Sequence, residues 1–136
     1  MIVVDTNIIC YFWIPGVKTQ LAEGLMQKDP LWLVPVLWRS EFQNVLAGCL
    51  RRGDLTLTQV TEILESAESF FSGKEFFIPS TNVMKLVSES KCTAYDCEFV
   101  ALAMQRKVHL ITGDKAVLRD FPQVALKIDD FIKAGV

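Results

Sequence analysis

Short apolar runs alternate with longer segments of helical periodicity along this chain, and few folds accommodate such a pattern. The runs are IVVD (2–5), LWLVPVL (31–37), EFFIP (75–79), VHLIT (108–112) and VALKI (124–128). Strands separated by helices pair in parallel through crossover connections. We therefore predict an α/β fold, a single three-layer domain over residues 1–136 in which a central parallel sheet is flanked by helices.

The segments between the apolar runs read as helices. Residues 38–53 repeat apolar side chains on one face and reach Gly53, a residue typical of helix ends. Thr56 and Gln59 form a capping-box pattern ahead of a long amphipathic stretch that ends at Phe71. Further helices are predicted over residues 19–29, 81–90, 92–103 and 115–121.

Two features bear on location. The apolar stretches are much shorter than the ~20 residues that cross a bilayer. The start MIVVDTN lacks the basic residues and small-residue cleavage site of a signal peptide. We therefore expect a cytoplasmic protein with no membrane partner.

The cysteines and the histidine point away from zinc and from a catalytic triad. The four cysteines form no CxxC pair, and His109 is the single histidine of the chain. Zinc sites usually need Cys and His at short spacings. We therefore interpret the cysteines as packing residues and His109 as a packed strand residue.

Two of the predicted strands end in an aspartate, Asp5 after IVVD and Asp114 after HLIT. Open parallel sheets place their sites at the carboxyl ends of strands, near the point where the strand order reverses. Capping of the helix that follows each strand is the alternative role for both residues, and the sequence leaves it open.

A third acid lies at the start of the predicted helix over residues 92–103. At about 100° per residue, Asp96 shares a side with Phe99 and Val100, whereas Glu98 falls on the opposite side. We therefore predict that Asp96 points inward and Glu98 points to solvent. Thr93 and Asp96 also match a capping-box variant, and this role is compatible with a functional one.

Glu41 lies at the edge of the apolar face of its helix, in the first turn. Complementation of the helix dipole is its structural alternative. Convergence of Glu41 with the three aspartates would bury uncompensated charge, which a divalent cation can offset. Ligands that are all oxygen suit Mg²⁺ or Mn²⁺ better than Zn²⁺.

Four motifs occur in order along nearly the whole chain: VVDTN (3–7), SEFQNVL (40–46), AYDCEFVALA (94–103) and LITGD (110–114). Together they resemble the successive motifs of PIN-domain nucleases, specifically the VapC-like toxins of type II toxin–antitoxin pairs. The resemblance implies an RNA-cleaving endonuclease that uses Mg²⁺ or Mn²⁺, pairs with a small antitoxin protein and commonly forms a homodimer.

The resemblance also implies roles for individual residues. The residues implied as metal ligands and catalytic groups are Asp5, Glu41, Asp96 and Asp114. Those implied to support the ligands are Thr6, Asn7 and Thr112. The formal net charge of −2 gives no general attraction for RNA, so local cations must hold the phosphates. Arg39 and Lys115 are the candidates because they lie nearest in sequence to the acids.

Three alternatives are weighed against this interpretation. A haloacid-dehalogenase-type phosphatase would have a second acid where Asn7 stands, and a response-regulator receiver would have an acidic pair near the first strand. A catalytically silent PIN-like module would serve to bind proteins, but the intact set of four acids argues against it. A free-standing PIN nuclease in RNA processing would keep the chemistry without an antitoxin.

Overall fold

Parallel strands form the centre of the molecule, as the alternation of apolar runs predicts. The computed structural model describes residues 1–134, so residues 135 and 136 of the predicted domain lie outside the described residues. The strands are β1 (Ile2–Val4), β2 (Trp32–Pro35), β3 (Glu75–Phe76), β4 (Leu110–Ile111) and β5 (Ala125–Leu126). All pair in parallel in the order β3-β2-β1-β4-β5. The predicted α/β class with a central parallel sheet is confirmed.

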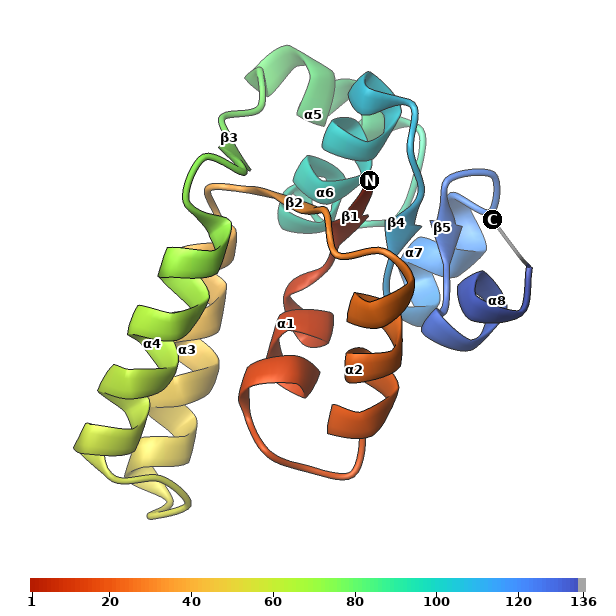
Figure 1. Cartoon of the computed structure of the whole chain (residues 1–136). Coiled ribbons are helices and arrows are strands. Elements are labelled where there is room, and N and C mark those ends of the chain that lie inside the picture. Colours follow the sequence, from red (N-terminus) through yellow and green to blue (C-terminus); the bar gives the residue numbers. More distant parts are fainter. Residues whose placement is uncertain (135–136) are drawn as a thin grey trace.

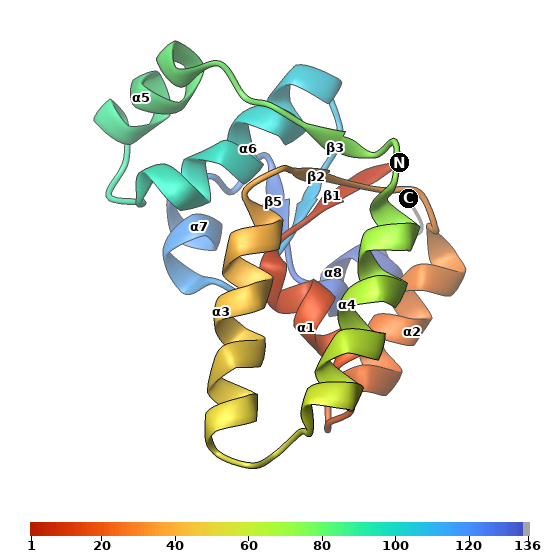
Figure 2. The ribbon, with the colours of Figure 1, turned by 90° about the vertical axis from the view of Figure 1, so that its left-hand side faces the viewer.

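Helices connect the strands and cover both faces of the sheet. They are α1 (Thr6–Trp13), α2 (Thr19–Lys28), α3 (Trp38–Arg51), α4 (Leu57–Phe71), α5 (Ser80–Ser88), α6 (Ala94–Arg106), α7 (Lys115–Asp120) and α8 (Ile128–Lys133). Helices α5 and α6 lie on one side of the sheet and α2 and α8 on the other (Figure 2). Helices α3 and α4 form a hairpin that extends away from the sheet (Figure 1).

The predicted helix signals are present where the sequence places them. Thr56 and Gln59 form the capping box, with Gln59 N donating to Thr56 Oγ1 and Thr56 N donating to Gln59 Oε1. Gly53 follows α3 with φ +78°, a conformation that favours glycine. Helix α8 begins at Ile128, which the sequence analysis assigns to the last strand, and no helix was predicted over its residues.

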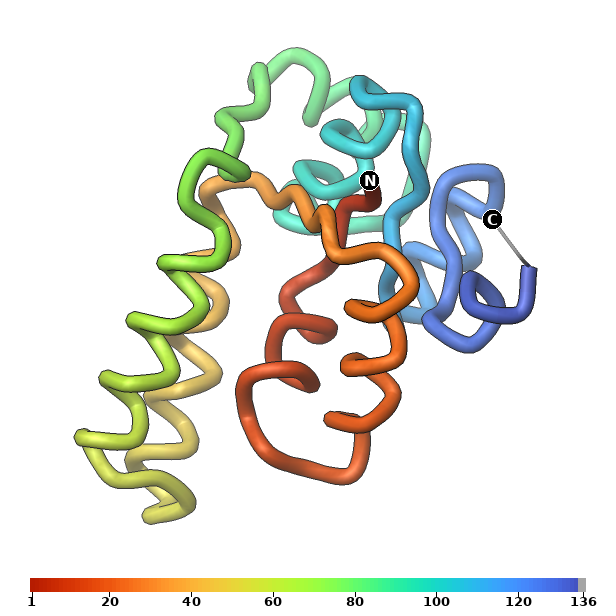
Figure 3. The backbone as a smooth tube through the Cα atoms, viewed as in Figure 1, coloured from red at the N-terminus to blue at the C-terminus, as the bar shows by residue number. Residues whose placement is uncertain are grey.

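The strand order reverses between β1 and β4. The chain adds β2 and β3 on one side of β1 and then returns through α5 and α6 to place β4 on the other side (Figure 3). Val3 and Val4 pair with Leu110 and Ile111. The carboxyl ends of β1 and β4 are therefore adjacent at the topological switch point, where open α/β sheets bind their ligands.

An aromatic cluster anchors the α3–α4 hairpin to the sheet. Trp32, Trp38 and Phe71 are fully buried, and the Trp38 ring centroid lies 4.8 Å from that of Phe71. Burial of each such side chain stabilises the fold by about 1.5–3 kcal/mol. Trp13 and Phe70 pack against the same rings, so these aromatic residues form core in the described chain.

The cysteines pack as predicted, whereas the histidine lies directly before β4 and not within a strand. Cys49, Cys92 and Cys97 are buried, Cys10 is half-buried, and all four are free thiols. His109 is half-buried, with its ring centroid 6.3 Å from that of Phe131. Across residues 1–134, the length and hydropathy needed to span a bilayer are not combined in any helix.

Candidate active site

The four acids singled out by the sequence lie at the starts of four different helices. Asp5 follows β1 and caps α1, and Asp114 follows β4 and caps α7. Glu41 lies in the first turn of α3 and Asp96 in the first turn of α6. The positive end of each helix dipole favours a carboxylate there. Capping and function are compatible, because a carboxylate has two oxygens and a cap occupies one of them.

Asp5 is the most buried of the four acids, with 8% of its surface exposed. Its Oδ1 accepts a hydrogen bond from Thr6 N at 2.8 Å, and its Oδ2 accepts one from Thr112 Oγ1 at 2.7 Å. Burial raises the pKa of Asp5 to about 6, and the charges of Asp96 and Glu41 add to the rise against the lowering by those two hydrogen bonds. Asp5 therefore holds its proton more tightly than an exposed aspartate does.

Two threonines link the acids to one another. Thr6 Oγ1 donates to Glu41 Oε1 at 2.7 Å, while the same residue donates its backbone N–H to Asp5. Thr112 Oγ1 donates to Asp5 and accepts from Asp114 N at 3.0 Å. Thr6 and Thr112 therefore hold the carboxylates of Asp5 and Glu41 through direct hydrogen bonds, whereas Thr112 contacts Asp114 only through its backbone N–H.

Asp96 is close enough to Glu41 and to Asp114 for their charges to repel one another. Burial and then the charge of Asp96 raise the pKa of Glu41. Burial and then the charge of Asp114 raise the pKa of Asp96. The four carboxylates thus share one region of the molecule, at the carboxyl ends of β1 and β4.

The carboxylates do not form a closed cluster in these side-chain positions. Within residues 1–134, no three His, Cys, Asp or Glu side chains lie close enough together to hold one ion. The four predicted ligands therefore lie in one region of the molecule, but they do not converge on one point.

The chemistry of the oxygens nevertheless fits a hard divalent cation. The buried Oδ1 of Asn7 has no hydrogen-bond partner among the described residues. The Nδ2 of Asn7 lies 3.8 Å from the position of a Cβ added to Gly113, which places this amide beside the β4–α7 loop. Carboxylate and amide oxygens are the ligands that Mg²⁺ and Mn²⁺ prefer. Asp5, Glu41, Asp96 and Asp114 are the acids expected to supply the carboxylate oxygens, and their role as ligands stays a prediction.

The prediction that Glu98 points to solvent is wrong. Glu98 is half-buried, and burial and then the charge of Glu41 raise its pKa. The helix-face argument fails because α6 contacts β1, β2 and β4 on one side and α5 on another. The exposed residues of α6 lie only in its first and last turns, so the middle of the helix has no free polar face. Glu98 is therefore a fifth acid near the site, which the sequence pattern did not reveal.

The structure gives Arg39 another role than phosphate binding. Its Nε and Nη2 donate to Glu75 at 2.6 and 2.8 Å, and its Nη1 donates to Glu68 at 2.9 Å. These bonds tie the start of α3 to α4 and β3. Because both carboxylates already occupy the guanidinium, the expectation that Arg39 binds substrate is corrected to a structural role.

Replacement of Arg39 with glutamine is expected to lower the free energy of unfolding by about 1–2 kcal/mol, because Glu75 loses its charged partner. RNA cleavage per folded molecule should stay close to that of the wild type. Urea denaturation and a cleavage assay measure the two quantities, with Arg51→Gln as the control at an exposed position of the same helix. Loss of cleavage at unchanged stability would return Arg39 to substrate binding.

The suggestion that Lys115 binds a substrate phosphate stays a prediction. It is exposed at the first position of α7, directly after Asp114. It lines a cavity together with Thr112 and Gly113, next to the acids. Within residues 1–134 it forms no ion pair.

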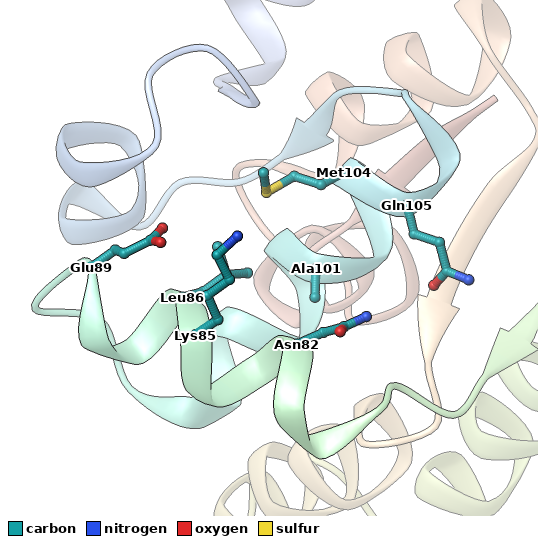
Figure 4. Close-up of a pocket in the computed structure, with 7 residues that line it drawn as sticks. All are labelled: Asn82, Lys85, Leu86, Glu89, Ala101, Met104 and Gln105. Carbon is teal, nitrogen blue, oxygen red and sulfur yellow. The ribbon is translucent and has the colours of Figure 1, made fainter.

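A larger cavity of about 350 Å³ lies between α5 and α6, away from this chemistry (Figure 4). Asn82 and Lys85 of α5, with Glu89 directly after it, face Ala101, Met104 and Gln105 of α6 across it. None of the predicted site residues lines this cavity. The acid-bearing edge of the sheet therefore remains the candidate site.

Comparison with known proteins agrees with this architecture. Residues 2–125 match the PIN domain family. No curated protein matches the sequence significantly.

Solved structures share the fold at low sequence identity. PAE2754 from Pyrobaculum aerophilum is 17% identical with a TM-score of 0.77, over 98% of this chain and 88% of that one. FitAcB from Neisseria gonorrhoeae is 18% identical with a TM-score of 0.72, over 94% of this chain and 98% of that one. On the family match and its extent, this chain belongs to the PIN domain family, whose members are generally nucleases.

Proposed function

We propose that this protein is a metal-dependent endoribonuclease that hydrolyses RNA phosphodiester bonds. The observation that carries the proposal is the set of four carboxylates at the switch point, three of which have raised pKa values. Acids that repel one another in this way favour a bound divalent cation, and Mg²⁺ or Mn²⁺ is the proposed one.

The chain's own residues orient the reacting groups. Thr112 and Thr6 fix the rotamers of Asp5 and Glu41 through hydrogen bonds of 2.7 Å. Asp96 and Glu41 present carboxylates that can accept a proton from an attacking water. Lys115 lies beside Asp114, where its ammonium can hold a phosphate oxygen of the substrate. A divalent cation in the site supplies charge neutralisation at the phosphate and lowers the pKa of a water.

The proposed setting is a toxin–antitoxin pair in the cytoplasm. The order of the four motifs and the family membership support a toxin with a small antitoxin as partner, and we propose a homodimer as its assembly. A short neighbouring reading frame that encodes a DNA-binding segment would support this setting. Its absence would favour a free-standing PIN nuclease in RNA processing.

A catalytically silent protein-binding module is the second candidate of a different class. The two are separated by incubating purified protein with single-stranded and structured RNA in Mg²⁺, in Mn²⁺ and in EDTA. The nuclease proposal expects internal cleavage with either cation and none in EDTA. Intact RNA in every condition, with folded protein, would favour the silent module.

A further inference from the structure

A cavity of about 250 Å³ is lined in part by the β4–α7 loop, next to Asp114. Thr112 and Gly113 form one wall, and Tyr11 of α1 and Ile128 of α8 form others. Thr112 also holds Asp5 through its hydroxyl. The cavity and the acidic site therefore share a wall.

Three lysines from three separate segments line this cavity: Lys18 before α2, Lys115 at the start of α7 and Lys127 before α8. All three are exposed, and none lies within 4.0 Å of a carboxylate oxygen in residues 1–134. Asp129 is the acid among the lining residues. We name this cavity the lysine pocket.

The arginines of the chain that lie near acids behave differently. Arg39, Arg52 and Arg119 each form an ion pair with a neighbouring carboxylate. Ion pairing satisfies these cations within the protein, whereas the lysines of the pocket retain their charge for an external anion.

Tyr11 contacts Lys18 and also lies next to the β4–α7 loop. Lys18 Nζ donates to Tyr11 Oη at 3.3 Å and lies 4.8 Å from the centroid of its ring. A Cβ added to Gly113 would lie 3.3 Å from the same Tyr11 Oη. The Lys18–Tyr11 pair therefore abuts the loop that carries Thr112 and Asp114.

We propose that the lysine pocket binds a phosphate of the RNA backbone adjacent to the phosphodiester at the acids. This inference rests on the proposed function, which makes RNA the substrate. Four carboxylates repel a polyanion, and the net charge of −2 does not compensate them. Lysines next to the acids can attract the phosphates that the carboxylates repel. A cavity of this size admits a phosphate with its ribose.

The test uses Asp96→Asn protein, which allows binding to be measured without cleavage. A Lys18→Gln/Lys127→Gln double variant is compared with a matched double variant, Arg51→Gln/Lys85→Gln. The matched variant removes the same charge at exposed positions on α3 and α5. Fluorescence anisotropy gives the Kd for fluorescein-labelled single-stranded RNA over a series of salt concentrations, and thermal unfolding checks that all variants fold.

The lysine variant should bind RNA about tenfold more weakly, and the slope of log affinity against log salt should fall by about 0.7, the value for one phosphate contact on a single strand. The matched variant should keep the parent's Kd and slope. Equal Kd and slope in the two double variants would overturn the proposal, as would a parent that binds no RNA. Displacement of the RNA by inorganic phosphate alone would also overturn it, in favour of a small-anion site.

The proposed function is tested separately, by measuring RNA cleavage with wild-type protein. Wild-type protein that binds RNA through the lysines but cleaves none would reject the nuclease and retain the lysine pocket. Cleavage by wild-type protein with no effect of the lysines on affinity would reject the pocket alone.

Discussion

Asp96→Asn is expected to reduce RNA cleavage by at least about a thousandfold. Asp96 lies among the acids at the start of α6, where its charge raises the pKa of both Asp5 and Glu41. Asparagine keeps the shape of the side chain but removes the charge that favours a cation and the group that accepts a proton. Cleavage rates of labelled RNA in Mn²⁺ measure the effect.

Two variants make this result specific. Glu98→Gln changes the half-buried acid two residues further along α6 and should lower cleavage by less than about tenfold, because we assign Glu98 no ligand role. Asp54→Asn changes an exposed acid in the α3–α4 loop and should leave the rate unchanged. Full loss in Glu98→Gln with activity kept in Asp96→Asn would exchange the roles of these two acids.

Asp5→Asn is expected to abolish activity and, at neutral pH without metal, to stabilise the fold. The pKa of Asp5 rises from 3.8 to about 6 in the native state, a difference worth up to about 3 kcal/mol. Because the native state holds this proton more tightly than the unfolded state, stability falls as the pH rises from about 4 to about 6. Asparagine carries no charge and so avoids this loss.

The amide must then replace one carboxylate oxygen that accepts a hydrogen bond from Thr6 or Thr112, at a cost of about 1 kcal/mol. Urea denaturation in EDTA at about pH 7.5 should therefore show Asp5→Asn to be more stable by roughly 1–2 kcal/mol. Near pH 4 the gain should disappear. A variant less stable than the wild type at both pH values would show that the Asp5 carboxylate stabilises the metal-free fold.

The pattern of the sequence determines most of the fold. Five apolar runs became five strands, since each is bounded by helical segments that force parallel crossovers. Strand lengths were not predictable, because β3, β4 and β5 keep two residues each and their ends depend on pairing partners. Helix α8 was missed, although Asp129 and Asp130 in its first turn are a signal for a helix start.

The site was predictable to the extent that it follows from strand ends. Asp5 and Asp114 could be assigned because the carboxyl ends of parallel strands share one edge. Glu98 was misassigned because periodicity on one helix does not show what packs on its other faces. The sequence did not mark Lys18 and Lys127 as site residues, because they come together only when α8 packs on α2. A hydrogen bond of 2.6 Å from Lys28 Nζ to Phe131 O is part of that packing.

Calorimetric titration of the metal-free protein with Mn²⁺ at about pH 6 tests the central claim most directly. Asp5 is roughly half-protonated at that pH. A cation held by the acids should therefore release protons, which titrations in buffers of different ionisation enthalpy detect. We predict binding with proton release in the wild type and at least about tenfold weaker binding in Asp96→Asn. Equal affinity of the two proteins for Mn²⁺, or no binding by the wild type, would contradict the account.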